Sequence, residues 1–586
     1  MWRLSEEFKK QIGKRLLQLY PAEDMEKLMA RLAIVRSRYA HLIDQMDADS
    51  SKWSQNDVIL ITYGDMVLSD NELPLSTLHR FLKEQLSDTI TTVHILPFFP
   101  YSSDDGFSVI DYRKVDPKLG NWEIVHDIAG DFKLMSDLVI NHISSKSDWF
   151  QNYLNGIAPE RNYFFEVDPG TDLSQVVRPR SLPLLTSVDT ISGVRYVWTT
   201  FSPDQVDINF GNPDLLFEML DIFLSYIEHG ARIIRLDAIA YLWKEVGTSC
   251  LNLNQTHAVV KLLRDIIDFG APQVLLLTET NLPHEQNISY FGDTDEAHLV
   301  YQFSLPPLLL HAIQTGTTRY LCQWAAALPA PPSGCNYLNF TASHDGIGLR
   351  PLEGLMEEEE ITALVSKIQQ LGGLISTRCD SEGKDHPYEM NITYFDSLGD
   401  PERPPDIKLK IARFLCSQAI MLSLQGIPAI YFHSLTGTRN NLEGVEQTGQ
   451  NRMINRSRWG FDDLVHQLED GKTVTAKVFR QYQQLLTVRR RRQAFHPDSP
   501  QEVLSLEDGL FGLLRIAQNR KNSIFILANL SVRSHTLSRE DLVGKHFPNG
   551  QVYDLLTEKE YAETITLKPY RTVWLSAVKE DESADG

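Results

Sequence analysis

Three carboxylates lie at the ends of apolar stretches in distant parts of the chain. Asp237 ends the run Ala231-Arg-Ile-Ile-Arg-Leu, and Glu279 ends the run Val274-Leu-Leu-Leu-Thr. Asp345 follows a shorter apolar run and a turn of small residues. Because an unpaired buried charge is costly, carboxylates at strand ends are expected to meet at one solvent-accessible mouth and not in a core.

These residue types could cleave and transfer a glycosyl group. Arg235 precedes Asp237 by two residues, so on a strand both side chains point the same way, and the cation favours an ionised, nucleophilic Asp237. Burial after an apolar run would raise the pKa of Glu279 toward that of an acid/base. Two carboxylates with opposed pKa shifts suit retaining glycoside chemistry. Asp345, preceded by His344, would hold sugar hydroxyls as positive charge develops.

Each feature alone has an ordinary structural explanation, such as an ion pair for Arg-x-Asp or a loop residue for a lone Glu. Their joint occurrence at successive strand ends favours catalysis. Eight segments read as strands, and amphipathic helical segments separate several of them, which predicts a (β/α)8 TIM barrel of the α/β class. The predicted strands lie near 57–63, 92–97, 134–140, 231–236, 274–278, 299–303, 337–340 and 426–432.

The remaining segments predict additions to this barrel. Helical periodicity marks an N-terminal extension, loop-rich and turn-rich stretches mark two insertions, and short β runs mark a C-terminal antiparallel β domain. The predicted units are an extension over 1–54, the barrel over 55–147 and 213–495, an inserted domain B after the third strand over 148–212, an insertion after the seventh strand over 346–405, and the β domain over 496–586.

Composition narrows the possible partners and location. The chain has 56 Lys and Arg against 77 Asp and Glu, a formal net charge of −21, which argues against binding to nucleic acid or an anionic membrane. Five scattered cysteines without a CxxC pair suit a reducing compartment. Because neither a signal peptide nor an apolar run of membrane-spanning length is evident, the expectation is a cytoplasmic protein that acts on small molecules. The oligomeric state is left undetermined.

Four segments resemble glycoside hydrolase family 13, the alpha-amylase clan: Asp137-Leu-Val-Ile-Asn-His142, Ala231-Arg-Ile-Ile-Arg-Leu-Asp237, Leu277-Thr-Glu279 and Phe340-Thr-Ala-Ser-His-Asp345. The resemblance implies that Asp237 is the nucleophile, Glu279 the general acid/base and Asp345 the transition-state stabiliser. It also implies a glucosyl-binding role in the −1 subsite, which would fall to His142, Arg235 and His344.

Within the clan, the loop Leu96-Pro-Phe-Phe-Pro-Tyr-Ser-Ser-Asp-Asp-Gly-Phe107 resembles the sucrose phosphorylase subfamily. By that resemblance Asp104 grips the far hydroxyls of glucose, Phe107 forms an apolar platform, and Arg452 holds glucose. No metal and no cofactor is expected, with inorganic phosphate as co-substrate. Phosphate must meet cations, for which the candidates are Arg452, Arg439, Lys244 and His344. Surface charge is the alternative reading for Arg439 and Lys244.

One departure from sucrose-specific members points to a particular acceptor. They carry Glu-x-His after the fifth strand, whereas this chain reads Glu279-Thr-Asn281 and resembles glucosylglycerate phosphorylases around it. The leading expectation is reversible phosphorolysis of 2-O-(α-D-glucosyl)-D-glycerate to α-D-glucose 1-phosphate and D-glycerate. Phosphorylases of sucrose, sucrose 6′-phosphate or glucosylglycerol are alternatives. An α-glucosidase is a weaker one, and a catalytically silent scaffold barrel is disfavoured because all three carboxylates are present.

Overall fold

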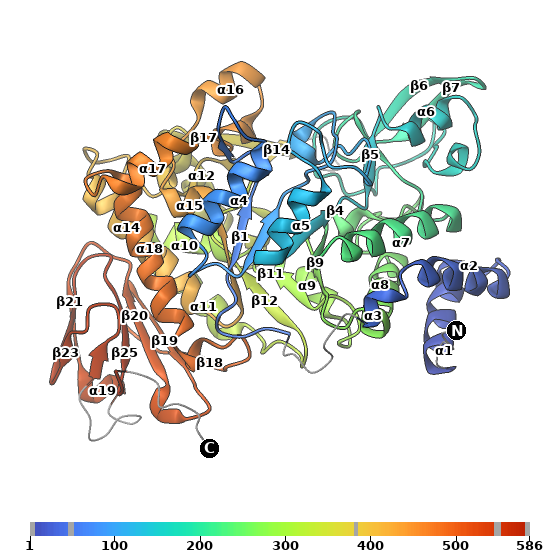
Figure 1. Cartoon of the computed structure of the whole chain (residues 1–586). Helices are drawn as coiled ribbons and strands as arrows, with labels where there is room; N and C mark the ends of the chain where they lie inside the picture. Colours follow the sequence, from blue (N-terminus) through green and yellow to red (C-terminus); the bar gives the residue numbers. More distant parts are fainter. Residues whose placement is uncertain (1–5, 45–51, 380–384, 544–551, 580–586) are drawn as a thin grey trace.

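Eight parallel strands close into a barrel at the centre of the molecule, in the order β1-β16-β12-β11-β10-β9-β4-β3 (Figure 1). The computed structural model describes residues 6–44, 52–379, 385–543 and 552–579. The barrel strands are β1 (Ile59–Thr62), β3 (Thr92–Ile95), β4 (Lys133–Leu138), β9 (Ala231–Leu236), β10 (Leu275–Thr278), β11 (Leu299–Tyr301), β12 (Asn336–Asn339) and β16 (Ile427–Tyr431). The predicted TIM barrel is confirmed.

The barrel strands are short apolar segments because both of their faces are covered. Nearly every residue of these strands is buried, so they lack the alternation of a half-exposed sheet. Helices that connect or cover them include α4 (Pro74–Gln85), α5 (Trp122–Asp131), α7 (Pro213–Glu228), α8 (Asn254–Gly270), α9 (His284–Ile288), α10 (Leu305–Thr315), α11 (Arg319–Ala327), α14 (Ile407–Ser423), α15 (Phe432–Thr436), α17 (Phe461–Glu469) and α18 (Val474–Arg490).

Two long excursions leave the barrel at the carboxyl ends of its strands. After β4 the chain forms β5 (His142–Ser144), α6 (Asp148–Leu154), the hairpin β6 (Leu185–Thr190) and β7 (Gly193–Trp198), and β8 (Gln205–Asp207), which pairs with β5. After β12 a sheet in the order β13-β15-β14 forms. Its elements are β13 (Ile347–Gly348), α12 (Glu358–Gln370), β14 (Leu374–Cys379), β15 (Asp385–Asn391) and α13 (Tyr394–Ser397). Both excursions send side chains toward the barrel mouth.

The N-terminal helices α1 (Glu6–Leu19), α2 (Met25–Arg38) and α3 (His41–Asp44) lie on the outside of the barrel near α7 and α8 (Figure 1). Phe8 packs edge-on against Phe269, with ring centroids 4.6 Å apart. The buried Arg15 guanidinium lies 3.2 Å from Asp265 Oδ2 and 2.8 Å from Asp295 Oδ2. This extension therefore braces the helices on either side of β9, and none of its described residues lines the pocket at the barrel mouth.

The C-terminal strands form an antiparallel sheet in the order β18-β19-β20-β25-β22-β23, with β21 and β24 pairing separately. Their bounds are β18 (Gln501–Val503), β19 (Leu510–Arg515), β20 (Ile524–Asn529), β21 (His535–Ser538), β22 (Val552–Asp554), β23 (Glu560–Tyr561), β24 (Thr564–Leu567) and β25 (Thr572–Ser576). The predicted β domain is confirmed. No helix in the described ranges is both long and apolar enough to span a bilayer.

Candidate active site

The three predicted carboxylates meet in one pocket at the carboxyl ends of the barrel strands. Asp237 directly follows β9, Glu279 directly follows β10, and Asp345 lies in the loop after β12. Adjacent pairing of β9 with β10 brings the first two side by side. The pocket has a cavity volume of about 70 Å³. Eight of the nine predicted site residues line it, namely Asp104, Phe107, His142, Asp237, Glu279, His344, Asp345 and Arg452.

The ninth, Arg235, lies beneath the pocket and links its carboxylates. Its Nη1 is 2.5 Å from Asp137 Oδ1 and 2.8 Å from Asp237 Oδ1, and its Nη2 is 3.8 Å from Glu279 Oε2. Asp137 is fully buried on β4, and its Oδ2 lies 2.7 Å from His94 Nε2. Arg235 therefore orients Asp237 and divides its charge among three carboxylates.

The predicted opposition of pKa values between Asp237 and Glu279 is wrong, because both pKa values are raised. Burial raises the pKa of Asp237 to about 7 and the pKa of Glu279 to about 7. Arg235 lowers both pKa values, but its charge is shared with Asp137, so burial prevails. Burial acts to raise the pKa of Asp345 as well, but Arg452 and further arginines hold it below its ordinary value.

The turn after β9 fixes Glu279 by a backbone hydrogen bond. Ala238 has a left-handed backbone with φ of 49°, and its N–H donates to Glu279 Oε2 at 3.0 Å. The Glu279 N–H in turn donates to the carbonyl of Leu236 at 3.1 Å. Because a non-glycine residue rarely adopts positive φ, this turn uses strained backbone to aim a donor at the carboxylate.

Aromatic and polar side chains complete a lining suited to a sugar. The Phe107 ring stacks on the His344 imidazole with centroids 4.7 Å apart and planes 4° apart, and His142 Nε2 lies 2.8 Å from the Phe107 carbonyl oxygen. Other lining residues are Phe201, Gln205, Tyr241 and Asn281. Throughout the described ranges, no group of three His, Cys, Asp or Glu side chains is arranged to hold a metal ion.

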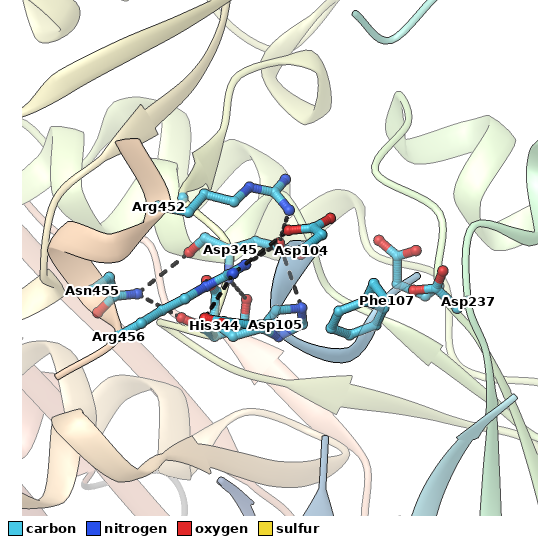
Figure 2. Close-up of polar contacts among 12 residues, drawn as sticks. Asp104, Asp105, Phe107, Asp237, His344, Asp345, Arg452, Asn455 and Arg456 are labelled. Carbon is cyan, nitrogen blue, oxygen red and sulfur yellow. Dashed lines mark hydrogen bonds and ion pairs between the residues drawn. The ribbon is translucent and has the colours of Figure 1, made fainter. Parts of the chain in front are cut away.

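Two arginines bind the acids on the other side of the pocket (Figure 2). Arg452 Nη1 lies 2.5 Å from Asp345 Oδ1. Arg456 Nη1 lies 3.5 Å from Asp104 Oδ1 and 3.2 Å from Asp105 Oδ2. Sequence reasoning named Arg452 and Asp104 but missed Arg456, which lies four residues after Arg452.

Of the four predicted phosphate-binding cations, His344 and Arg452 line the pocket, whereas Lys244 and Arg439 do not. Lys244 is buried away from the pocket, with Nζ 2.6 Å from Asp207 Oδ2 and 2.7 Å from Asn141 Oδ1. Arg439 lines a different pocket and lies 2.5 Å from Asp396 Oδ1. Burial and the arginines around it lower the pKa of His344 well below its ordinary value, so its ring is neutral. The fourth candidate, Arg452, is already paired with carboxylates.

Arg180 is a pocket cation that sequence reasoning missed. It comes from the first excursion, lines the pocket, and lies with its guanidinium 5.7 Å from the ring centroid of Tyr388 on β15. Within the described residues, no carboxylate pairs with it. It stands in a loop without periodicity, so no sequence pattern predicted its position at the barrel mouth.

The barrel and its three convergent carboxylates define a catalytic domain of the alpha-amylase type. Residues 84–330 match the family described as Alpha amylase, catalytic domain. The glucosylglycerate phosphorylase of Spirochaeta thermophila is 47% identical over 89% of this chain and 90% of its own, and that of Escherichia coli is 42% identical over 95% and 97%. The chain belongs to the glucosylglycerate phosphorylase family, as its sequence resemblance predicted.

A solved structure supports the same fold. The sucrose 6F-phosphate phosphorylase from Thermoanaerobacter thermosaccharolyticum superposes with a TM-score of 0.71 at 25% identity, covering 84% of this chain and 95% of the other. A sucrose phosphorylase from Agrobacterium vitis is 33% identical over 69% of this chain and 82% of its own. Both relatives are more distant in sequence than the glucosylglycerate phosphorylases above.

Proposed function

We propose that this protein catalyses reversible phosphorolysis of 2-O-(α-D-glucosyl)-D-glycerate to α-D-glucose 1-phosphate and D-glycerate. The observation that carries the proposal is the meeting of Asp237, Glu279 and Asp345 in one pocket at the barrel mouth, in a chain whose curated relatives at 42–47% identity bear that activity in their names. Inorganic phosphate is the co-substrate, and the reaction uses no metal or other cofactor.

The chemistry proceeds through two displacements at the anomeric carbon. Asp237, in its ionised form, attacks that carbon to form a glucosyl ester while Glu279, in its protonated form, donates its proton to the departing glycerate oxygen. With both pKa values near 7, each of these forms is present in part at neutral pH. The ionised Asp345 stabilises the positive charge that develops on the ring. A phosphate oxygen then displaces Asp237, and any phosphate proton passes to Glu279. Two inversions retain the α configuration.

Glycerate in the first half-reaction and phosphate in the second are both anions, and each needs a cation in the pocket. Arg235, Arg452 and Arg456 are already bound to carboxylates. Among the described residues, Arg180 has no carboxylate partner and lies against the Tyr388 ring, so its guanidinium can donate hydrogen bonds to either phosphate or the glycerate carboxylate. We assign Arg180 as the residue that receives both anions in turn.

Replacing Arg180 with Ala should raise the KM for phosphate roughly 10–100-fold, because one charge-assisted contact to the dianion is lost. The same variant should release more free glucose, since water meets less competition for the glucosyl ester. Initial rates over a phosphate series measure both effects. Arg439→Ala is the matched control, because Arg439 lies in a separate pocket and should leave both quantities unchanged.

The acceptor is tested with a donor panel. Purified protein is incubated with phosphate and, separately, glucosylglycerate, sucrose, sucrose 6′-phosphate or glucosylglycerol, and glucose 1-phosphate and free glucose are measured. We expect glucosylglycerate to give the highest kcat/KM and mostly glucose 1-phosphate. A preference for sucrose would reassign the acceptor, and mostly free glucose at saturating phosphate would make the protein a glucosidase.

We also propose a cytoplasmic location. Four described cysteines, Cys250, Cys322, Cys335 and Cys416, carry free thiols, which is the state kept in a reducing compartment. The reaction consumes inorganic phosphate and yields a sugar phosphate, and both are retained inside a cell.

A further inference from the structure

Glu389 is a buried carboxylate that reaches the active site from the second excursion. It lies on β15, the central strand of the three-stranded sheet, and its residue is 1% exposed. It does not line the pocket, yet its neighbour Tyr388 does. A carboxylate at this depth is costly unless its oxygens are fully engaged.

Glu389 engages two groups that adjoin Asp345. Its Oε1 and Oε2 accept hydrogen bonds from Arg452 Nε at 3.0 Å and Arg452 Nη2 at 2.7 Å, a bidentate pair. Its Oε1 also accepts the N–H of Gly346, the residue after Asp345, at 2.9 Å. A single carboxylate thus fixes both the arginine that contacts Asp345 and the backbone that carries Asp345.

The packing leaves little freedom in this arrangement. A Cβ at Gly346 would lie 2.5 Å from Glu389 Cγ, so glycine is required for the close approach. With Nε and Nη2 on Glu389 and Nη1 on Asp345, every nitrogen of the Arg452 guanidinium contacts a carboxylate. Planar, bidentate geometry of this kind restricts rotation of the arginine.

We propose that Glu389 is a positioning residue that holds Asp345 in place, through Arg452 and the Gly346 backbone, to face the charge that develops on the glucosyl ring. This inference rests on the proposed role of Asp345 and extends it to a residue outside the pocket. Glu389 also neutralises Arg452, which leaves Arg180 as the cation that takes the incoming anion. Loss of Glu389 would let Arg452 turn, and Asp345 with it.

The test compares two ligands that share hydroxyls and differ in ring charge. A cationic iminosugar of glucose configuration depends on a well-placed Asp345, whereas neutral D-glucose depends mainly on its hydroxyl contacts. In Glu389→Gln, iminosugar affinity should fall about tenfold or more, while glucose affinity should change less than about threefold. Competition against glucose 1-phosphate turnover, or calorimetry where turnover is too slow, measures both dissociation constants.

Asp396→Asn is the matched control. Asp396 is another buried acid of the same excursion, and it pairs with Lys410 and Arg439 outside the pocket. It should leave the ratio of the two affinities unchanged even if it lowers the melting temperature. Glu389→Asp, which keeps the charge but shortens the reach, should lie between wild type and Glu389→Gln, and it replaces Glu389→Gln if that variant does not fold.

A folded Glu389→Gln, or failing that a folded Glu389→Asp, with the wild-type ratio of affinities would overturn the positioning role. The role would also be overturned if Asp396→Asn changed the ratio of the two affinities as much as Glu389→Gln does. The effect would then follow from the loss of any buried acid in this excursion. Neither outcome touches the proposed phosphorolysis, which the donor panel decides on wild-type protein. Conversely, the binding test would stay valid if the acceptor were different, because the iminosugar and glucose bind only in the glucosyl site.

Discussion

Asp237→Asn should abolish formation of the glucosyl intermediate and lower kcat by roughly 10⁴-fold or more. The amide has nearly the shape of the carboxylate and can still contact Arg235, whose Nη1 lies 2.8 Å from Asp237 Oδ1. It cannot attack the anomeric carbon, so the loss reports chemistry and not folding. Steady-state release of glucose 1-phosphate measures turnover, and intact-mass analysis after mixing with glucosyl fluoride measures the covalent adduct.

A second buried acid serves as the control for that variant. Asp221 on α7 is 7% exposed and pairs with Arg38 and Arg113, and none of the three lines the pocket. Asp221→Asn should keep wild-type turnover and adduct formation with some loss of thermal stability. Turnover of Asp237→Asn within about tenfold of wild type would remove Asp237 from the nucleophilic role.

The sequence predicted the barrel and its carboxylates because their signal is local. Asp237 and Glu279 each follow an apolar run with the length of a buried strand, and the strand end alone determines which mouth such a residue faces. Parallel strands next to one another then bring the two acids together without any knowledge of side-chain packing. For Asp237 and Glu279, the order of the strands along the chain was sufficient to predict that the two carboxylates meet.

Residues contributed by the excursions were not predictable in the same way. Arg180 and Glu389 stand in segments whose place over the barrel depends on tertiary packing, and nothing in their immediate neighbours indicates a pocket. The reverse error affected Lys244 and Arg439. Both looked available as cations, but Asp207 and Asp396 neutralise them from distant parts of the chain. The sequence shows which residues are charged but not which charged residues pair with them in the fold.

The pKa of Asp237 illustrates the same limit. Arg235 two residues away predicted an ionised carboxylate, and the predicted contact exists. The sequence could not show that Asp137 on β4 competes for that guanidinium at 2.5 Å, nor how completely the pocket excludes water around Asp237. The pKa of a buried carboxylate depends on every charged group around it, whereas a strand can be recognised from its own short segment of sequence.

Glu279→Gln should separate substrates by the quality of their leaving group. Glucosylglycerate releases an alkoxide that needs a proton, so its kcat should fall roughly 10²–10⁴-fold. Glucosyl fluoride releases fluoride, which needs little protonation, and its loss should be below about tenfold. Parallel rates with the two donors measure the difference, and an equal loss with both would exclude Glu279 as the acid.

The pH profile gives an independent reading of the same residue. Burial raises the pKa of Glu279 to about 7, so its protonated form is present below that pH and is lost as pH rises. Wild-type kcat/KM for glucosylglycerate should therefore decline above pH 7, whereas for glucosyl fluoride this alkaline decline should be weak. In Glu279→Gln the alkaline decline should disappear for both donors, because the group that titrates is gone. An alkaline limb that persists unchanged in the variant would assign the titration, and the proton delivery, to another group in the pocket.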